Sequence, residues 1–511
     1  TADKVNVAAY DTDLGENKHT EYINKRGLDA TGTSYLENIK DTSEDLYEKN
    51  ADGTMKLDEK GQPILKVGQT GNTIVTGALG ITATTGSGGG SGSAAISISD
   101  INNDFNASIK NSNIKTNGLA ADGADDVADV NVLAKSDTLL VNIAAGGAGA
   151  SKGFAGAGSF GWSTVNNDNT ASIENSTIDA ATTKVNAISG TLGVNVAGQV
   201  TVGKQALGLA VAYNDLENNT GAYILGSDIK NTDTNDEGNE VIEETDVTVA
   251  AENSGKMYAV GAGVGVSTDT AAANGTIAIN RGNNNLEAIV GDYGSGEDTR
   301  HTKITNAENI DVTSNDTASV LSVAGGVGVS KKVAVGGSVA YNEIGNISGN
   351  ADGKIQNNTA QINNAVITTA NGATIDVQAL DDADLTTAAV GVGVAVGGNV
   401  AVQGAAATAL INKDTEASMN GVIINKASEQ DNSGADVTVE ASSSNDIVTT
   451  ADTVSVMAGG TGAAVGAGVA VNRSEANVNA LVSGGTMNVD DLAVRAANSA
   501  NITTVGVGGS V

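Results

Sequence analysis

The chain has 511 residues, of which 66 are Gly, one is Pro and none is Cys, with 3% aromatic residues and a formal net charge of −33. So few large side chains exclude an ordinary set of globular domains, whose cores need large apolar residues. The acidic balance excludes nucleic-acid binding and direct docking on anionic lipid, since both need a basic face.

Disorder is the alternative interpretation of so much Gly, Ser, Asn and Asp. The apolar residues argue against it, because Val, Ile and Ala are abundant and alternate with polar residues or Gly over many segments. Such alternation is typical of β-strands. The composition therefore predicts an all-β chain.

The first predicted element is a strand within residues 1–12, where DKVNVAA alternates. Residues 13–71 differ in composition and predict a small α+β insertion, with helical spacing in TSYLENIKDTSEDLYEKN and a hairpin in DGTMKLDEKGQPILKV. Tyr22, Tyr35 and Tyr47 are its candidate partner-binding residues, because Tyr supplies contact area with a polar group. A decorative or capping insert is the alternative.

Residues 72–511 contain two recurring patterns, which indicates a repeat protein. One is an Asp before alternating apolar residues, as in DVNVLA, DVTVAA and DVTVEA. The other closes a Gly-rich strand, as in VAYNDLENNTGAYI, IAINRGNNNLEAIV and VAVNRSEANVNALV. Both patterns step by about 50 to 70 residues.

The repeats predict a parallel β-helix, or β-solenoid, of about seven superrepeats. A period of about 62 residues is long for one coil, so we expect each superrepeat to hold three coils of roughly 20 residues. At about 4.8 Å per coil, the result is a rod on the order of 100 Å long. An array of separate β-sandwich domains is the alternative architecture. Because VGVGGSV ends within a strand pattern and no signal peptide is evident, we expect a window of a longer chain.

Asn recurs at the junctions after the Gly-rich strands, at Asn214, Asn280, Asn342, Asn412 and Asn472. These residues could stack as an amide ladder. With repeats some 60 residues apart, a role as turn residues is the preferred interpretation.

A candidate Ca²⁺ loop lies in NTDTNDEGNEVIEE, where Asp233, Asn235, Glu237 and Glu244 fit D-x-N-x-E-G-x₅-E. The pattern resembles an EF-hand loop, in which such oxygens converge on the ion. It departs from that pattern in its Glu at the third ligand position and in its strand flanks. Ca²⁺ is accordingly the one cofactor kept as an alternative to none.

A second irregular segment, GDYGSGEDTRHTK, brings Tyr293, Glu297, Asp298, Arg300 and His301 into one loop. An acid, a base and a His suggest catalysis, but a Gly/Ser loop without an evident scaffold favours a solvated turn. With two His and no Cys, no zinc constellation is predicted. We therefore predict that the chain is not an enzyme, and keep a glycan-processing β-helix enzyme as the least favoured alternative.

Strings such as VAGGVGVSKKVAVGGSVAYNEIGN, followed by an Asp-Val-x-Val strand, resemble the repeat passengers of large autotransporter adhesins. The resemblance is to leukotoxin-like and haemagglutinin-like exoproteins of anaerobic Gram-negative bacteria, and it covers the chain from about Asn72 onward. It implies a right-handed parallel β-helix, secreted and tethered at the outer membrane. We therefore expect an adhesin that binds a protein or glycan on a host or partner cell. A self-associating extracellular filament or stalk with a purely structural role is the alternative.

Overall fold

The computed structural model describes residues 4–10, 72–86, 88–116, 129–234, 239–345, 356–426 and 434–511. These residues are almost entirely in β-strands, so the prediction of an all-β chain is confirmed. No helix of the described part could cross a membrane. The predicted α+β insertion at 13–71 lies outside the described residues.

Strands one full repeat apart pair directly and in parallel. Asn167 pairs with Asn218, 51 residues later, and Asn280 with Asn342, 62 residues later. The prediction of three 20-residue coils in each repeat is therefore wrong: one repeat forms a single layer of the stack. Paired strands from successive repeats also do not fit an array of separate β-sandwich domains.

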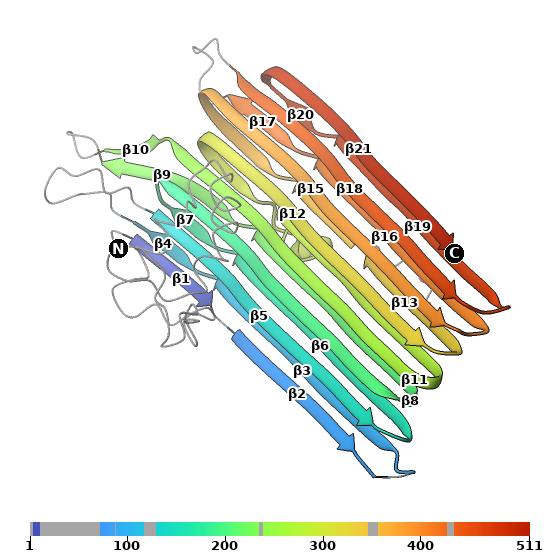
Figure 1. The fold of residues 1–511 in the computed structure, drawn as a ribbon. Coiled ribbons are helices and arrows are strands. Elements are labelled where there is room, and N and C mark those ends of the chain that lie inside the picture. The colour runs from blue at the N-terminus through green and yellow to red at the C-terminus, as the bar shows by residue number, and fades with distance from the viewer. Residues whose placement is uncertain are drawn as a thin grey trace, which may run out of the picture.

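Each layer begins with one long wall, which we call wall A. Figure 1 shows its strands side by side, in chain order from blue to red. Along it, Val141 pairs with Val194, Val194 with Tyr258 and Tyr258 with Leu321. Wall A consists of β1 (Lys4–Tyr10), β2 (Asn72–Thr84), β5 (Asp129–Ala150), the first part of β8 (Thr182–Leu225), the first part of β11 (Thr245–Gly291), β12 (Lys303–Ser330), β15 (Val366–Val396), β18 (Ala435–Ala458) and β21 (Val489–Ser510).

After a tight reversal the chain returns along a second wall, wall B. Wall B consists of β3 (Ser91–Lys110), β6 (Phe154–Glu174), the second parts of β8 and β11, β13 (Val333–Ile344), β14 (Gln356–Asn363), β16 (Val400–Asn420) and β19 (Ala463–Ser483). Short strands then complete the layers: β4 (Asn113–Lys115), β7 (Thr177–Asp179), β9 (Asp228–Thr234), β17 (Ile423–Lys426) and β20 (Thr486–Met487). Two further elements lie outside the walls, β10 (Glu240–Glu243), which pairs antiparallel with β9, and the 3-10 helix η1 (Gly296–Asp298).

The first layer shows where the chain leaves and rejoins the stack. Tyr10 at the end of β1 pairs with Lys135 of β5, and Asn72 at the start of β2 pairs with Thr138 of the same strand. Only two residues of β5 separate these partners. Residues 11–71 are thus inserted between two parts of one wall strand.

The space between the walls narrows toward the reversal, because the inward side chains become smaller. The largest buried cluster holds Ile and Val such as Ile310 and Val312, the next holds Leu140 and Val165, and the third is made of Ala. Near the reversal, a Cβ added at Gly146 would lie 2.6 Å from the carbonyl oxygen of Gly158 on the opposite wall. The close approach of the walls there requires glycine.

The proportions differ from the predicted rod. Eight consecutive wall A segments, at about 4.8 Å spacing, stack to roughly 34 Å, whereas a strand of some 20 residues is about 66 Å long. The predicted length on the order of 100 Å is therefore wrong, since it assumed three coils for every repeat. The described chain is a stack of long layers, broad along the strands.

Candidate functional site

An open groove of about 780 Å³ lies on the outer face of wall B, away from the narrow reversal. Wall strands expose alternate residues, so residues two apart form neighbouring outward rows. The groove crosses several of these rows and therefore several layers. Its lining comprises Asp104, Asp168, Thr170, Asn219, Thr220, Gly221, Tyr223, Asn285, Glu287, Asn357 and Asp414.

One outward row supplies most of these carboxylates and amides. The row runs through Asp104, Asp168, Asn219, Asn285, Asn357, Asp414 and Asn477, one from each layer. Asn219 Nδ2 donates to Asp168 Oδ1 at 2.6 Å, and Asn285 Nδ2 donates to Asn219 Oδ1 at 3.0 Å. Each bond uses one of the two N–H groups of its amide and fixes that side chain within the row. The carboxylates of Asp104, Asp168, Glu287 and Asp414 add acceptor oxygens to the groove.

In the middle of the groove, Gly221 leaves space that the side chain of Tyr223 occupies. The ring of Tyr223 lies over this position, since a Cβ at Gly221 would be 2.3 Å from the Tyr223 hydroxyl oxygen. That hydroxyl donates to Oε2 of Glu287, one layer away, at 2.7 Å. Burial, together with the charge of Glu287, raises the pKa of Tyr223 above its usual range. The phenol therefore stays a neutral donor and holds the Glu287 carboxylate in place.

An aromatic row lies on the same outer face, nearer the reversal and about 20 Å along the strands from the row of Asp168 and Asn219. Trp162 and Tyr213 stack with ring centroids 4.1 Å apart and planes 23° from parallel. Phe160 lies 6.0 Å from Trp162, centroid to centroid, and Trp162 is 36% exposed. Ile98, Ile279 and Tyr341 occupy the same row in other layers. Exposed aromatic rings in such a row can pack against another apolar surface.

Charged side chains lie beside the aromatic row, on its side toward the groove. Arg281 Nη1 donates to the Tyr213 hydroxyl at 3.5 Å, and its Nε donates to Glu343 Oε2 at 3.2 Å. Tyr341 donates to the same carboxylate oxygen at 2.9 Å. Burial is the main cause that raises the pKa of Tyr213 and of Tyr341. Both phenols are therefore neutral donors at neutral pH.

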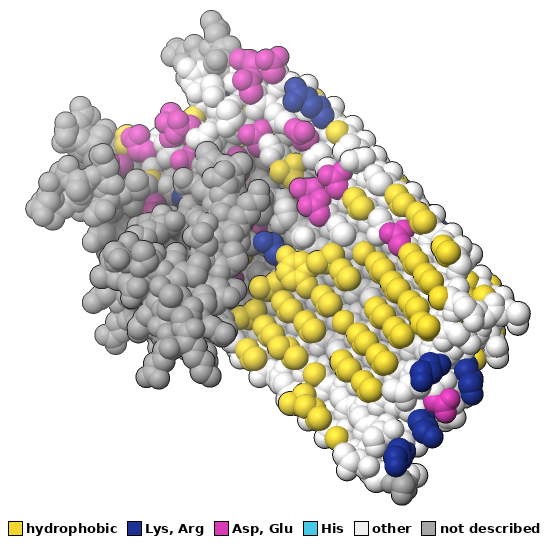
Figure 2. Space-filling view, viewed as in Figure 1, with side chains coloured by type: hydrophobic (Ala, Val, Ile, Leu, Met, Phe, Trp, Pro, Cys, Tyr) yellow, Lys and Arg dark blue, Asp and Glu magenta, His cyan; other side chains and the backbone are white. Residues whose placement is uncertain are grey.

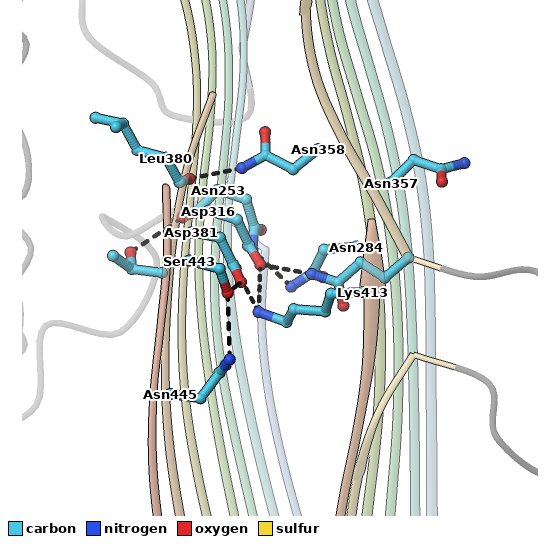
Figure 3. A network of polar contacts seen from close by, with 12 residues as sticks. Asn253, Asn284, Asp316, Asn357, Asn358, Leu380, Asp381, Lys413, Ser443 and Asn445 are labelled. Carbon is cyan, nitrogen blue, oxygen red and sulfur yellow. Dashed lines mark hydrogen bonds and ion pairs between the residues drawn. The ribbon is translucent and has the colours of Figure 1, made fainter. Parts of the chain in front are cut away.

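A buried polar network lies directly behind the groove, between the two walls. Figure 3 shows Asn358 pointing inward to donate to the Leu380 carbonyl at 2.6 Å, while Asn357 points the other way, toward the groove. Inside, Asn253 and Asn284 donate to Asp316 Oδ1 at 2.6 and 3.2 Å. The network continues toward the other end of the stack through buried Asn side chains, from Asn218 to Asn167 and Asn103. It fixes the strands whose outward residues line the groove.

The predicted amide ladder is present in part, although turn residues were the preferred interpretation. Asn214 Nδ2 donates to Asn280 Oδ1 at 2.8 Å, and Asn280 Nδ2 donates to Asn342 Oδ1 at 3.1 Å. The preference for turns was wrong because it treated residues one repeat apart as distant, whereas they are adjacent in the stack. Asn412 does not join, since Ala409 pairs with both Asn342 and Asn472 and interrupts the ladder.

The predicted binding residues of the insertion, Tyr22, Tyr35 and Tyr47, lie outside the described residues. The same holds for Asn235 and Glu237 of the candidate Ca²⁺ loop. Asp233 lies in β9, opposite Val241 of β10, and the Glu244 carbonyl accepts from Asn231 Nδ2 at 2.8 Å. Within the described ranges, no three His, Cys, Asp or Glu residues are grouped to hold a metal ion. The Ca²⁺ loop stays a prediction.

The loop at 291–303 is fixed to the stack. Tyr293 and Arg300 form an antiparallel bridge, and Arg300 binds Asp228 at 2.9 Å and Asn175 at 2.8 Å. His301 Nδ1 lies 2.6 Å from Asp292, whose other oxygen accepts from Asn364 Nδ2. Arg300 and His301 thus have separate structural partners in neighbouring layers. The arrangement agrees with a turn, which these contacts anchor.

Sequence reasoning missed the groove and the aromatic row. The signal was present: FGWS, VAYN, IAIN and VAYN place Trp162, Tyr213, Ile279 and Tyr341 at one repeat position. Aligned as single layers, they predict an outward aromatic row. The groove could be located only from the register that brings its residues from different layers onto one outer face.

Comparisons with protein-family models, with curated proteins and with solved structures found no match.

Proposed function

We propose that this chain is part of a secreted β-solenoid adhesin that binds a neutral glycan through the wall B groove. The solenoid assignment is supported by the parallel register between equal repeat positions in successive layers. Localisation at the surface of a Gram-negative cell, tethered to the outer membrane, rests on the resemblance to autotransporter passengers. The chain's role is attachment, without catalysis.

The observation that carries the proposal is an oxygen-rich groove on the same outer face as an exposed aromatic row. Sugar rings have apolar faces that pack on aromatic rings and hydroxyl groups that donate to carboxylates and amide oxygens. Asp168, Glu287 and Asp414 supply charged acceptors, and Trp162 with Tyr213 supplies the apolar surface. The same carboxylates repel acidic glycans, so the expected ligand is neutral.

The groove also suits an extended ligand. It crosses layers from Asp104 to Asp414, and each layer adds about 4.8 Å. A glycan that lies along the stack would meet similar groups repeatedly, and one that also extends about 20 Å along the strands would reach the aromatic row. Repeated weak contacts raise the total affinity without a single deep pocket.

The test is binding of neutral oligosaccharides to the whole chain, measured by titration calorimetry. Trp162→Ala and Glu287→Gln should each weaken binding by about ten-fold or more, as expected for loss of one well-placed contact. Asp446→Asn, on the exposed face of wall A, is the matched control and should bind normally. Binding that is unaffected by both groove variants would refute the proposed site.

The insertion at 13–71 is a competing location for the binding site, with Tyr22, Tyr35 and Tyr47 as its predicted contacts. Because Ser136 and Asp137 separate the β5 partners of β1 and β2, two residues suffice to join Tyr10 to Asn72. A variant in which two residues replace residues 11–71 should keep the strand content and thermal stability of the stack. If it loses binding while the groove variants retain it, the insertion is the site and the groove is not.

A further inference from the structure

The outer face of wall A carries a broad apolar surface near the reversal. It is formed by the outward residues from Val75 to Ala83 of β2 and by their register partners through β21. We call it the valine face. Figure 2 shows apolar side chains in parallel rows over one face, with acidic side chains toward one end and basic ones at the other.

The rows of the valine face are regular. One row places Val200, Val264, Val327, Val392 and Val454 in successive layers. Of these, Val200 is 51% exposed, Val264 37% and Val454 47%, although they belong to strands with paired neighbours. Asp452 is the one charged side chain among the described residues of this face. The chain has a net charge of −33, yet this area of wall A is almost free of charge.

The area is sufficient for a stable interface. Eight segments at about 4.8 Å and five outward positions at about 6.7 Å span roughly 34 by 27 Å, on the order of 900 Å². A typical monomer exposes an apolar patch of about 300 to 600 Å². A stable interface buries about 800 Å² on each partner.

The shape of the face favours a second copy of the same chain. In the row Leu79, Ala145, Gly198, Ala262, Gly325 and Val390, glycine and alanine leave hollows between larger side chains. A copy with the same spacing can place its Val side chains in those hollows, as facing β-sheets do. An ionic partner would find almost no charge to bind here.

We propose that two copies of this chain pack through their valine faces. The contact is isologous, with the same surface on both copies, and it buries rows that are exposed in the single chain. It is independent of the glycan groove, which lies on the opposite wall. A pair joined in this way carries two grooves facing outward, which doubles its binding sites.

The test is the mass of the whole chain in solution, measured by sedimentation over a range of concentrations. We expect a dimer, and Val264→Lys, near the centre of the valine face, should shift it to a monomer of half the mass. The matched control is Val339→Lys, at a 41% exposed outward position of wall B, which should remain dimeric. Circular dichroism of both variants checks that the strands are intact.

Spin labelling gives a second measurement, because the chain has no Cys. A label at Val264→Cys should show a short distance to the label on the other copy, whereas a label at Val339→Cys should show a long one. A monomer at all concentrations overturns the proposal. A dimer that Val339→Lys disrupts and Val264→Lys leaves intact also overturns it. A monomer that floats with phosphatidylcholine vesicles would overturn it too, and would identify lipid as the partner.

Discussion

The ammonium of Lys413 on wall B lies 3.3 Å from Oδ2 of Asp316 on wall A, and both side chains are shielded from solvent. Lys413 also donates to Asp381, one layer further along wall A. Ser443 donates to the other oxygen of Asp381 at 3.0 Å. A charged bridge thus joins the two walls and three layers (Figure 3). Outright loss of one partner would leave a buried charge unpaired.

Replacing Lys413 by Met should therefore destabilise the chain strongly. The substitution keeps the length of the side chain but leaves two buried carboxylates without a cation, and such losses cost about 3–5 kcal/mol. The measurement is chemical denaturation followed by circular dichroism. Lys426→Met is the control, because the Lys426–Asp490 pair is partly exposed and contributes at most about 1 kcal/mol. Equal effects of the two variants would contradict a structural role for the buried bridge.

The same bridge should make the chain more stable in mild acid. Burial, opposed by Lys413 and reinforced by Asp316, raises the pKa of Asp381 to about 6 from its usual 3.8. Between these values the folded chain holds a proton that the unfolded chain has lost, so stability falls as pH rises. Protonated Asp381 contributes on the order of 3 kcal/mol to the free energy of unfolding. This contribution is fully present below about pH 4 and is lost as the pH rises through about 6.

Denaturation midpoints across this pH range check the expectation. Burial and the neighbouring carboxylates of Asp376 and Asp246 also raise the pKa of Asp311 to about 6, so the native chain titrates at more than one place. Asp381→Asn should therefore reduce the slope of stability against pH without abolishing it. If the native chain instead gains stability from pH 4 to pH 7, the pH dependence of its stability is dominated by paired carboxylates whose pKa is lowered on folding.

The narrowing of the layers leads to a prediction about glycine. Gly146→Ala should destabilise the chain by about 1–3 kcal/mol, because its Cβ would meet the opposite wall at 2.6 Å and force the walls apart. Gly158→Ala is a matched control, since a Cβ there meets no atom within 4 Å. Thermal unfolding of both variants is the measurement. A Gly146→Ala chain as stable as the Gly158→Ala chain would mean that the walls can separate freely.

The all-β fold could be predicted because alternation along the chain directly reports which side chains face outward. The size of a layer could not, because periodicity gives the repeat length without saying how often the chain turns within it. Asn214 and Asn280 illustrate the consequence: their spacing of 66 residues suggested separation, whereas their side chains touch. The groove depends on this stacking, so its residues could be found only once the register was known.

The Asn ladder gives a last prediction about what holds adjacent layers in register. Asn280 accepts from Asn214 and donates to the Leu321 carbonyl at 2.8 Å and to Asn342. Asn280→Ala removes these bonds and leaves buried polar groups unsatisfied, at a cost of about 1–3 kcal/mol.

The control is Asn102→Ala, at an exposed position on β3, where the change should be within about 0.5 kcal/mol. Hydrogen exchange measured by mass spectrometry should locate the effect of Asn280→Ala in the layers that contain Asn214 and Asn342. The chain itself tolerates Ala409 at the equivalent position, where Ala is packed among buried apolar side chains. If Asn280→Ala is equally well tolerated, apolar packing and backbone pairing alone hold the register, and the ladder adds no measurable stability.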